Sequence, residues 1–154
     1  MIKINDEIPK FEILTDTGDF KISNYKGKKI VVFFFPRADT SGCTAESIPF
    51  TNLQHEFDRL DCIVIGISKD NQKKQSKFRE KYNLTCELGA DFENDVCEQF
   101  GVWVEKSMYG KKYMGIQRST FLSNEQGIIT NIWEKVKVPG HAEEVLETVK
   151  SINN

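Results

Sequence analysis

The sequence lacks the features that would assign it to several large classes of protein. Its 154 residues contain two histidines and four cysteines, and no two cysteines form a Cys-x-x-Cys motif or a zinc-finger spacing. A thioredoxin-type dithiol site and a zinc site are therefore poorly supported, and we expect no metal and no other cofactor. The formal net charge is −2, so the chain carries no basic excess that would attract nucleic acid or anionic lipid.

Long apolar runs and linkers are missing as well. No run approaches the roughly 18 apolar residues of a membrane span, and residues 1–7 contain no apolar stretch typical of a signal peptide. We therefore expect a cytoplasmic protein in a reducing setting, without a disulfide framework. Repeats, low-complexity tracts and Pro/Gly/Ser-rich linkers are also absent, which predicts a single domain spanning residues 1–154.

The apolar residues that are present alternate between strand-like and helix-like segments. Residues 29–35, Lys-Ile-Val-Val-Phe-Phe-Phe, form a nearly continuous run typical of a central strand buried on both faces. The predicted strands are residues 11–14, 20–22, 29–35, 62–67, 85–88, 119–122 and 128–133. The predicted helices are residues 43–60, with a kink or an irregular first turn because of Pro49, and residues 71–82, 93–100 and 142–152.

The order of these elements predicts the fold class. Strands alternate with helices and are followed by a hairpin and a closing helix. This order predicts an α/β protein with a central mixed β-sheet flanked by helices and with an N-terminal β-hairpin. The thioredoxin-like fold is the smallest well-known architecture of this kind.

Cys43 is the first candidate for chemistry. A predicted strand ends at Pro36, a polar loop follows, and a helix begins at about Cys43. A cysteine in the first turn of a helix meets unpaired N–H groups and the positive end of the helix dipole, and both favour the nucleophilic thiolate. Thr40 can offer a hydroxyl group to a peroxide. The alternative is a buried structural cysteine, and the residues alone favour neither interpretation.

These residues resemble a known family. The pattern Pro36-x-x-x-Thr40-x-x-Cys43 is similar to the active-site motif of the peroxiredoxins. The wider strings Phe-Phe-Pro and Thr-x-Gly-Cys-Thr-x-Glu resemble the bacterioferritin comigratory protein / peroxiredoxin Q branch. Similar landmarks recur along nearly the whole chain, at residues 100–103, at residues 115–122, which include Arg118, and at residues 136–146.

The resemblance implies a thiol-dependent peroxidase that reduces hydrogen peroxide and organic hydroperoxides. Cys43 would be the peroxidatic nucleophile, oxidised to sulfenic acid. Thr40 would hydrogen-bond the peroxide and the thiolate, and Pro36 would shield the pocket. Arg118 would favour the thiolate and stabilise charge in the transition state. Glu46 would hold Arg118 in place, or would be a solvated carboxylate at the helix start.

The resemblance also bears on how the sulfenic acid is reduced. Members of this branch often carry a resolving cysteine five residues after the peroxidatic one, which here is Ile48, or in the helix expected at residues 71–82, which has none. It therefore implies a one-cysteine enzyme, a monomer, reduced by thioredoxin or by glutathione with glutaredoxin. Core packing is the better interpretation of Cys62, Cys86 and Cys97. If one of them resolves the sulfenic acid, we expect Cys86 or Cys97.

Two other readings stay open on the sequence alone. A thioredoxin-like disulfide reductase would need the Cys-x-x-Cys motif that the chain lacks. A thioredoxin-fold redox sensor would need only an oxidisable Cys43. The presence of both Thr40 and Arg118 favours an enzyme that turns over.

Overall fold

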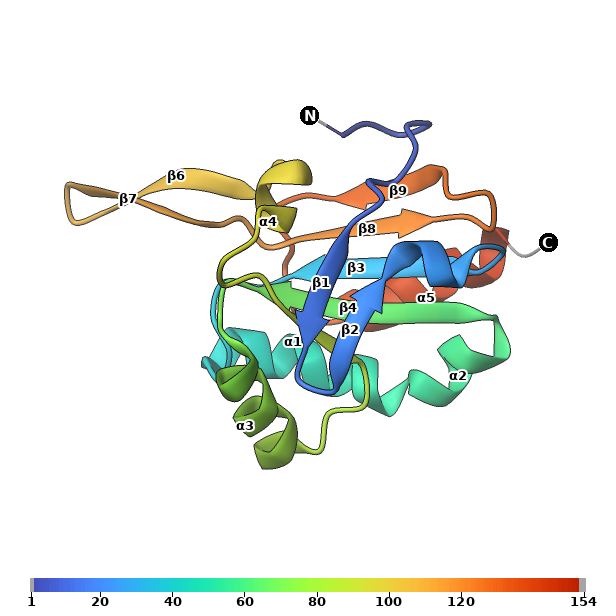
Figure 1. Cartoon of the computed structure of the whole chain (residues 1–154), viewed down its shortest axis with the longest axis horizontal. Helices are drawn as coiled ribbons and strands as arrows, with labels where there is room; N and C mark the ends of the chain where they lie inside the picture. Colours follow the sequence, from blue (N-terminus) through green and yellow to red (C-terminus); the bar gives the residue numbers. More distant parts are fainter. Residues whose placement is uncertain (1, 153–154) are drawn as a thin grey trace.

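A seven-stranded mixed sheet forms the centre of the protein (Figure 1), in a computed structural model that describes residues 2–152. Its strands β3, β4 and β5 are parallel, and the remaining pairs are antiparallel. Across the sheet the order is β2 (Gly18–Lys21), β1 (Glu12–Thr15), β5 (Glu87–Ala90), β4 (Cys62–Ser68), β3 (Lys29–Phe34), β8 (Ser119–Ser123) and β9 (Ile129–Trp133). The mixed sheet and the N-terminal hairpin β1–β2 agree with the predicted fold class.

The sheet separates two apolar layers. Every residue of β3 is buried, and its side chains alternate between the layers, with Phe33 on one face and Phe34 on the other. On the Phe33 face lie helices α1 (Ser41–Asn52), α2 (Gln54–Arg59), α3 (Gln72–Tyr82) and α5 (His141–Ile152). The Phe34 face is covered by the 3₁₀ helix η1 (Ile22–Tyr25) and by α4 (Val96–Gln99). None of the helices described between residues 2 and 152 combines the length and the apolar character of a bilayer-spanning segment.

The helix predicted over residues 43–60 is two helices. Pro49 has no N–H to donate to the carbonyl one turn before it. Helix α1 continues through Pro49 but ends at Asn52, and the Leu53 N–H closes the last turn on the Pro49 carbonyl at 3.0 Å. Helix α2 then begins at Gln54, so the irregularity lies after the proline rather than in the first turn.

The predicted boundaries of one strand and one helix were wrong because side chains form hydrogen bonds with the local backbone. The strand predicted at residues 85–88 is β5, which begins at Glu87 because the Thr85 N–H donates to Thr51 Oγ1 and the Cys86 carbonyl accepts from Arg79. The helix predicted at residues 93–100 is the shorter α4. Its start is set by the buried Asp91 carboxylate, which accepts hydrogen bonds from the first two N–H groups of the helix.

The sequence reading missed a two-stranded ribbon. Strands β6 (Trp103–Met108) and β7 (Lys111–Ile116) pair only with each other and project from the body of the protein (Figure 1). They are joined by Tyr109 and Gly110, both at positive φ, as a tight hairpin turn requires. The ribbon is largely exposed and mixes apolar with charged side chains, so it lacks the regular apolar alternation from which a strand is usually recognised.

Candidate active site

Cys43 lies at the carboxyl edge of the parallel strands. Strand β3 ends at Phe34, and the following loop leads into α1 at Ser41, which makes Cys43 the third residue of the helix. The first hydrogen bond of the helix joins the Thr44 N–H to the Thr40 carbonyl at 2.9 Å. The N–H groups before Thr44 therefore have no intrahelical acceptor and provide positive potential at Cys43, whose side chain is fully buried.

Arg118 reaches Cys43 although 75 residues separate them. It stands immediately before β8, and β8 pairs with β3 in an antiparallel register that places Ser119 opposite Phe34. The last residue of one strand and the first of the other therefore meet at the same edge of the sheet. Arg118 Nη2 donates to Cys43 Sγ at 3.3 Å.

Glu46 completes the contact on the other side of the guanidinium. It lies one turn after Cys43 on α1, and its Oε1 accepts from Arg118 Nη1 at 2.5 Å. The side chain is buried, so it is not the solvated carboxylate that the sequence left as an alternative. Burial raises the pKa of Glu46 to about 7, even though the positive charge of Arg118 acts to lower it.

Arg118 stays cationic in this setting. Burial acts to lower its pKa, but the neighbouring Glu46 carboxylate and Cys43 sulfur outweigh burial, and the net change is upward. The three side chains therefore form a line from carboxylate to guanidinium to sulfur. A permanent positive charge in contact with a sulfur atom favours its thiolate form.

Thr40 and Pro36 lie on the loop between β3 and α1, just before the helix that carries Cys43. Thr40 is the residue preceding α1, and its hydroxyl donates to the Arg37 carbonyl at 3.1 Å. The expected hydrogen bond to Cys43 is absent from the contacts of the described residues, because the Thr40 hydroxyl points back along the loop. Pro36, Arg37 and Thr40 form one wall of a groove of about 460 Å³.

The opposite wall of this groove was not anticipated from the sequence. It comes from the β6–β7 ribbon, which contributes Trp103, Lys106 and Met114. A two-residue turn containing Gly110 was the available signal for a hairpin here. The floor is closed by the segment between β4 and α3, where the Asp70 carboxylate accepts from the Ala38 N–H at 2.7 Å and so fixes the loop before Cys43.

The other three cysteines are free, buried and distributed around the sheet. Cys97 lies in the apolar layer on the face opposite that of Cys43. Cys62 is level with Lys29 at the amino end of the parallel strands, roughly 17 Å along the strand from the end that leads to Cys43. Cys86 shares the face of Cys43, but it is level with Val64, roughly 10 Å before that end.

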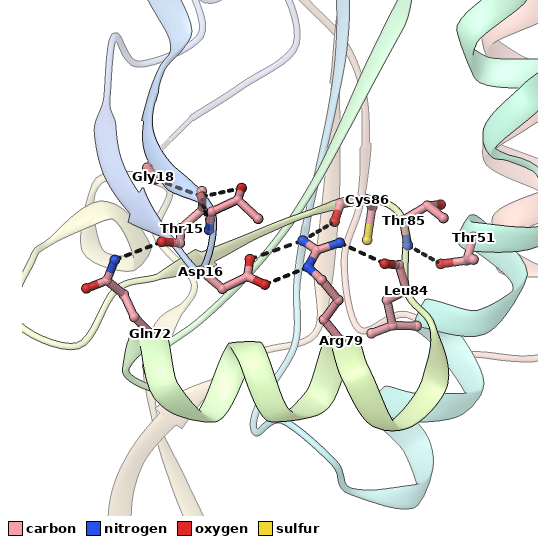
Figure 2. A network of polar contacts seen from close by, with 10 residues as sticks. Thr15, Asp16, Gly18, Thr51, Gln72, Arg79, Leu84, Thr85 and Cys86 are labelled. Carbon is pink, nitrogen blue, oxygen red and sulfur yellow. Dashed lines mark hydrogen bonds and ion pairs between the residues drawn. The ribbon is translucent and has the colours of Figure 1, made fainter.

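A polar network holds the segment that contains Cys86 (Figure 2). Arg79, in the last turn of α3, donates to the Leu84 carbonyl at 2.7 Å and to the Cys86 carbonyl at 2.8 Å. The same guanidinium pairs with Asp16 in the β1–β2 turn, with its Nε at 2.5 Å from Asp16 Oδ2. Burial raises the pKa of the Cys86 thiol to about 12, and that of the Cys62 thiol likewise. The network therefore fixes the backbone of Cys86, and the Cys86 thiol is a buried side chain of the core.

Sequence comparisons place this arrangement among known proteins. A family model described as AhpC/TSA matches residues 4–132. The chain is 44% identical to the putative peroxiredoxin Bcp of Coxiella burnetii over 146 residues, which cover 94% of this chain and 97% of that protein. It is also 44% identical to the peroxiredoxin Bcp of Bacillus subtilis over 153 residues, which cover 99% and 98% of the two chains.

Solved structures of related proteins are also similar to this chain over nearly its full length. The bacterioferritin comigratory protein of Xanthomonas campestris, described for its alkyl peroxide reduction activity, is 33% identical with a TM-score of 0.91, covering 99% of this chain and 100% of that one. A variant of the peroxiredoxin Q of Xylella fastidiosa is 32% identical with a TM-score of 0.94, covering 100% and 99%. These matches confirm the predicted thioredoxin-like fold.

Proposed function

Because this chain belongs to the AhpC/TSA family, as a member of its bacterioferritin comigratory protein / peroxiredoxin Q branch, and is a thiol-dependent peroxidase, we propose that Cys43 is the residue that reacts with the peroxide. One observation carries this assignment: Arg118 Nη2 lies 3.3 Å from Cys43 Sγ, with Glu46 on the other side of the guanidinium. Cys97 also stands in the first turn of a helix, α4, but its N–H already donates to the Asp91 carboxylate at 2.8 Å, whereas Cys43 is the cysteine that Arg118 contacts.

The reaction that this site supports is a displacement on oxygen. The Cys43 thiolate attacks the terminal oxygen of the hydroperoxide, the S–O bond forms as the O–O bond breaks, and the sulfur gives up two electrons to become a sulfenic acid. The departing hydroxide or alkoxide takes up a proton and leaves as water or alcohol. Arg118 and the free N–H groups of α1 stabilise the negative charge on the reacting atoms.

Thr40 and Pro36 act on the peroxide rather than on the sulfur. In our proposal the Thr40 hydroxyl turns from the Arg37 carbonyl to hydrogen-bond an incoming peroxide in the groove. Pro36 shields the approach from bulk water at the groove wall. Glu46 holds Arg118 in place, since its Oε1 accepts from the guanidinium and its burial leaves it little freedom to move away.

We propose a one-cysteine cycle. A disulfide needs Cα atoms within roughly 7 Å. The sheet separates Cys97 from Cys43, the length of the strands separates Cys62, and the Arg79 network holds the backbone of Cys86 away from the reactive edge. An external thiol therefore attacks the sulfenic acid with loss of water, and a second thiol releases Cys43 from the mixed disulfide.

The external thiol in this proposal is thioredoxin, or glutathione with glutaredoxin. The compartment in which these reductants operate is the cytoplasm. We further propose that the protein acts as a monomer, because Cys43, Thr40, Glu46 and Arg118 all come from one chain. Peroxide consumption with each purified reductant system, together with sedimentation of the reduced and oxidised protein, tests these assignments.

The decisive experiment is the intact mass after one equivalent of hydrogen peroxide, with dimedone present to trap sulfenic acid. We expect one dimedone adduct, mapped to Cys43, and no adduct in Cys43→Ser. A mass loss of two hydrogens without an adduct would show an internal disulfide, and peptide mapping would then identify Cys86 or Cys97 as its partner. Substantial peroxide turnover by Cys43→Ser would overturn the assignment of the nucleophile.

A further inference from the structure

A second cation, Lys106, approaches the site from the β6–β7 ribbon. It lies on β6 opposite Tyr113, and its side chain runs across β7 to donate from Nζ to the Ile116 carbonyl. Ile116 is two residues before Arg118, and Lys106 lines the same groove as Thr40. The ammonium group is thus held at the last residue of β7, just before the segment that carries Arg118.

Gly115 keeps the path of this side chain open. A Cβ atom at position 115 would lie 3.2 Å from Lys106 Cδ and 3.5 Å from Lys106 Cε. The first of these is closer than ordinary van der Waals contact, so a methyl group here would push the lysine stem aside by a few tenths of an ångström. The absence of a side chain at Gly115 therefore has a specific consequence: it lets Lys106 lie flat over β7 and reach the Ile116 carbonyl.

The ammonium of Lys106 is not neutralised by a carboxylate. Within residues 2–152, no Asp or Glu oxygen lies within ion-pair distance of Lys106, whereas its groove neighbour Lys69 pairs with Asp91 and Glu98. Burial lowers the pKa of Lys106, the charge of Arg118 lowers it further, and the charge of Cys43 raises it. These influences agree with the position of the ammonium on the Ile116 carbonyl, two residues before Arg118.

Most of the other charged side chains that line the groove are positive as well. They are Arg37, Lys69 and Lys74, with Asp70 as the one carboxylate, and the lining also includes Tyr113. The Asp70 carboxylate accepts from the Ala38 N–H at 2.7 Å and from the Ser68 hydroxyl at 2.6 Å. The groove, which includes Thr40, thus has an excess of positive charge next to the loop that leads to Cys43, and a cleft lined mainly by one sign of charge strengthens the field inside it.

We propose that Lys106 is a positioning residue of the peroxidase site: held on the Ile116 carbonyl, its ammonium adds a second positive charge beside Arg118 and favours both the thiolate form of Cys43 and the negatively charged transition state. The inference rests on the role proposed above for Cys43. Lys106 does not touch the sulfur, and it acts through the field that it adds to that of Arg118. Two like charges repel, and the Glu46 carboxylate on Arg118 offsets that cost.

The test compares Lys106→Met, which removes the charge but keeps an apolar stem, with Lys106→Arg, which keeps the charge. The matched control is Lys112→Met, because Lys112 lies on the neighbouring strand with its side chain in solvent. The thiolate of Cys43 is titrated by its ultraviolet absorbance against a Cys43→Ser blank. Burial keeps the other three cysteines as thiols over this range, since it raises the pKa of each.

We expect the titration midpoint of Lys106→Met to rise by about one pH unit, and its rate with hydrogen peroxide at neutral pH to fall about tenfold. Lys106→Arg should restore most of the wild-type midpoint and most of the wild-type rate, and Lys112→Met should match the wild type in both. Gly115→Ala keeps the charge but displaces it. It should raise the titration midpoint and lower the rate, each by less than Lys106→Met does. If Lys106→Met folds poorly, Gly115→Ala is the variant that tests the proposal.

These measurements distinguish a failure of the Lys106 proposal from a failure of the Cys43 assignment. If Lys106→Met and Gly115→Ala both titrate and react like the wild type, while Cys43→Ser is inactive, the role of Lys106 is refuted and that of Cys43 stands. If Cys43→Ser keeps peroxidase activity, the nucleophile has been misassigned and the inference about Lys106 falls with it. A slow Lys106→Met with an unchanged thiolate titration would also overturn the electrostatic role.

Discussion

Replacement of Glu46 by glutamine tests the electrostatics of the site through the stability of the protein. The carboxylate is buried, and its only hydrogen-bond donor among the described side chains is Arg118. Glutamine has nearly the same shape and keeps an oxygen to accept from the guanidinium, but it carries no charge and does not titrate. The substitution therefore removes a single proton equilibrium and leaves the packing in place.

The size of the effect follows from the pKa of Glu46. Burial raises this pKa from 4.5 to about 7, so the native protein holds a proton that the unfolded chain has already released. The stability contributed by that proton is present in full below the unfolded pKa and is lost as the pH rises through the folded pKa. Between about pH 5 and about pH 8, linkage gives a loss of about 2 to 3 kcal/mol in the free energy of unfolding.

Urea unfolding of both proteins at the two pH values measures this difference. Titrating groups elsewhere in the chain contribute equally to both proteins and cancel when the pH dependence of one is subtracted from that of the other. We expect the wild type to lose about 2 to 3 kcal/mol more than Glu46→Gln between about pH 5 and about pH 8. Glu80→Gln, on the exposed face of α3, should follow the wild type. The same pH dependence in the wild type and in Glu46→Gln would refute the reasoning.

Two further predictions concern arginines. Arg118→Met removes the cation beside Cys43 Sγ and should slow the reaction with hydrogen peroxide about a hundredfold, whereas the exposed Arg59→Met should not; an unchanged stopped-flow rate for Arg118→Met would rule out its role. Arg79→Met frees the Cys86 carbonyl and should lower the free energy of unfolding by about 2 to 3 kcal/mol. It should also speed the alkylation of Cys86, followed by mass spectrometry, and equal labelling of the wild type would count against the network.

The reactive segment could be predicted because its signals are local. A buried strand, Pro36, a polar loop and a helix start follow one another within a few residues, and each has a short-range physical signature. The structure has these elements in this order, with β3 in the centre of the sheet and Cys43 in the first turn of α1. The wrong boundaries at residues 85–88 and 93–100 arose where side chains from outside each segment, the distant Thr51 and the nearby Asp91, bind the local backbone.

The surroundings of Cys43 depend on contacts between distant segments. Taken alone, Arg118 is an ordinary surface residue in the sequence, and only the antiparallel pairing of β8 with β3 brings it to the sulfur. The sequence leaves two interpretations of Glu46 because the burial of a helix residue depends on what packs against it. The Lys106 side of the groove was missed altogether, because an exposed ribbon of mixed apolar and charged residues has no regular apolar pattern.

By itself, then, the sequence determined the fold class, the central strand and the candidate nucleophile, because hydrophobic periodicity and helix-start chemistry act between neighbouring residues. The tertiary structure alone decided which charges stand around that nucleophile and which cysteines are separated from it. Strand order places Cys97 behind the sheet and Arg118 beside Cys43, and strand order arises from the packing of the whole chain rather than from any segment of it.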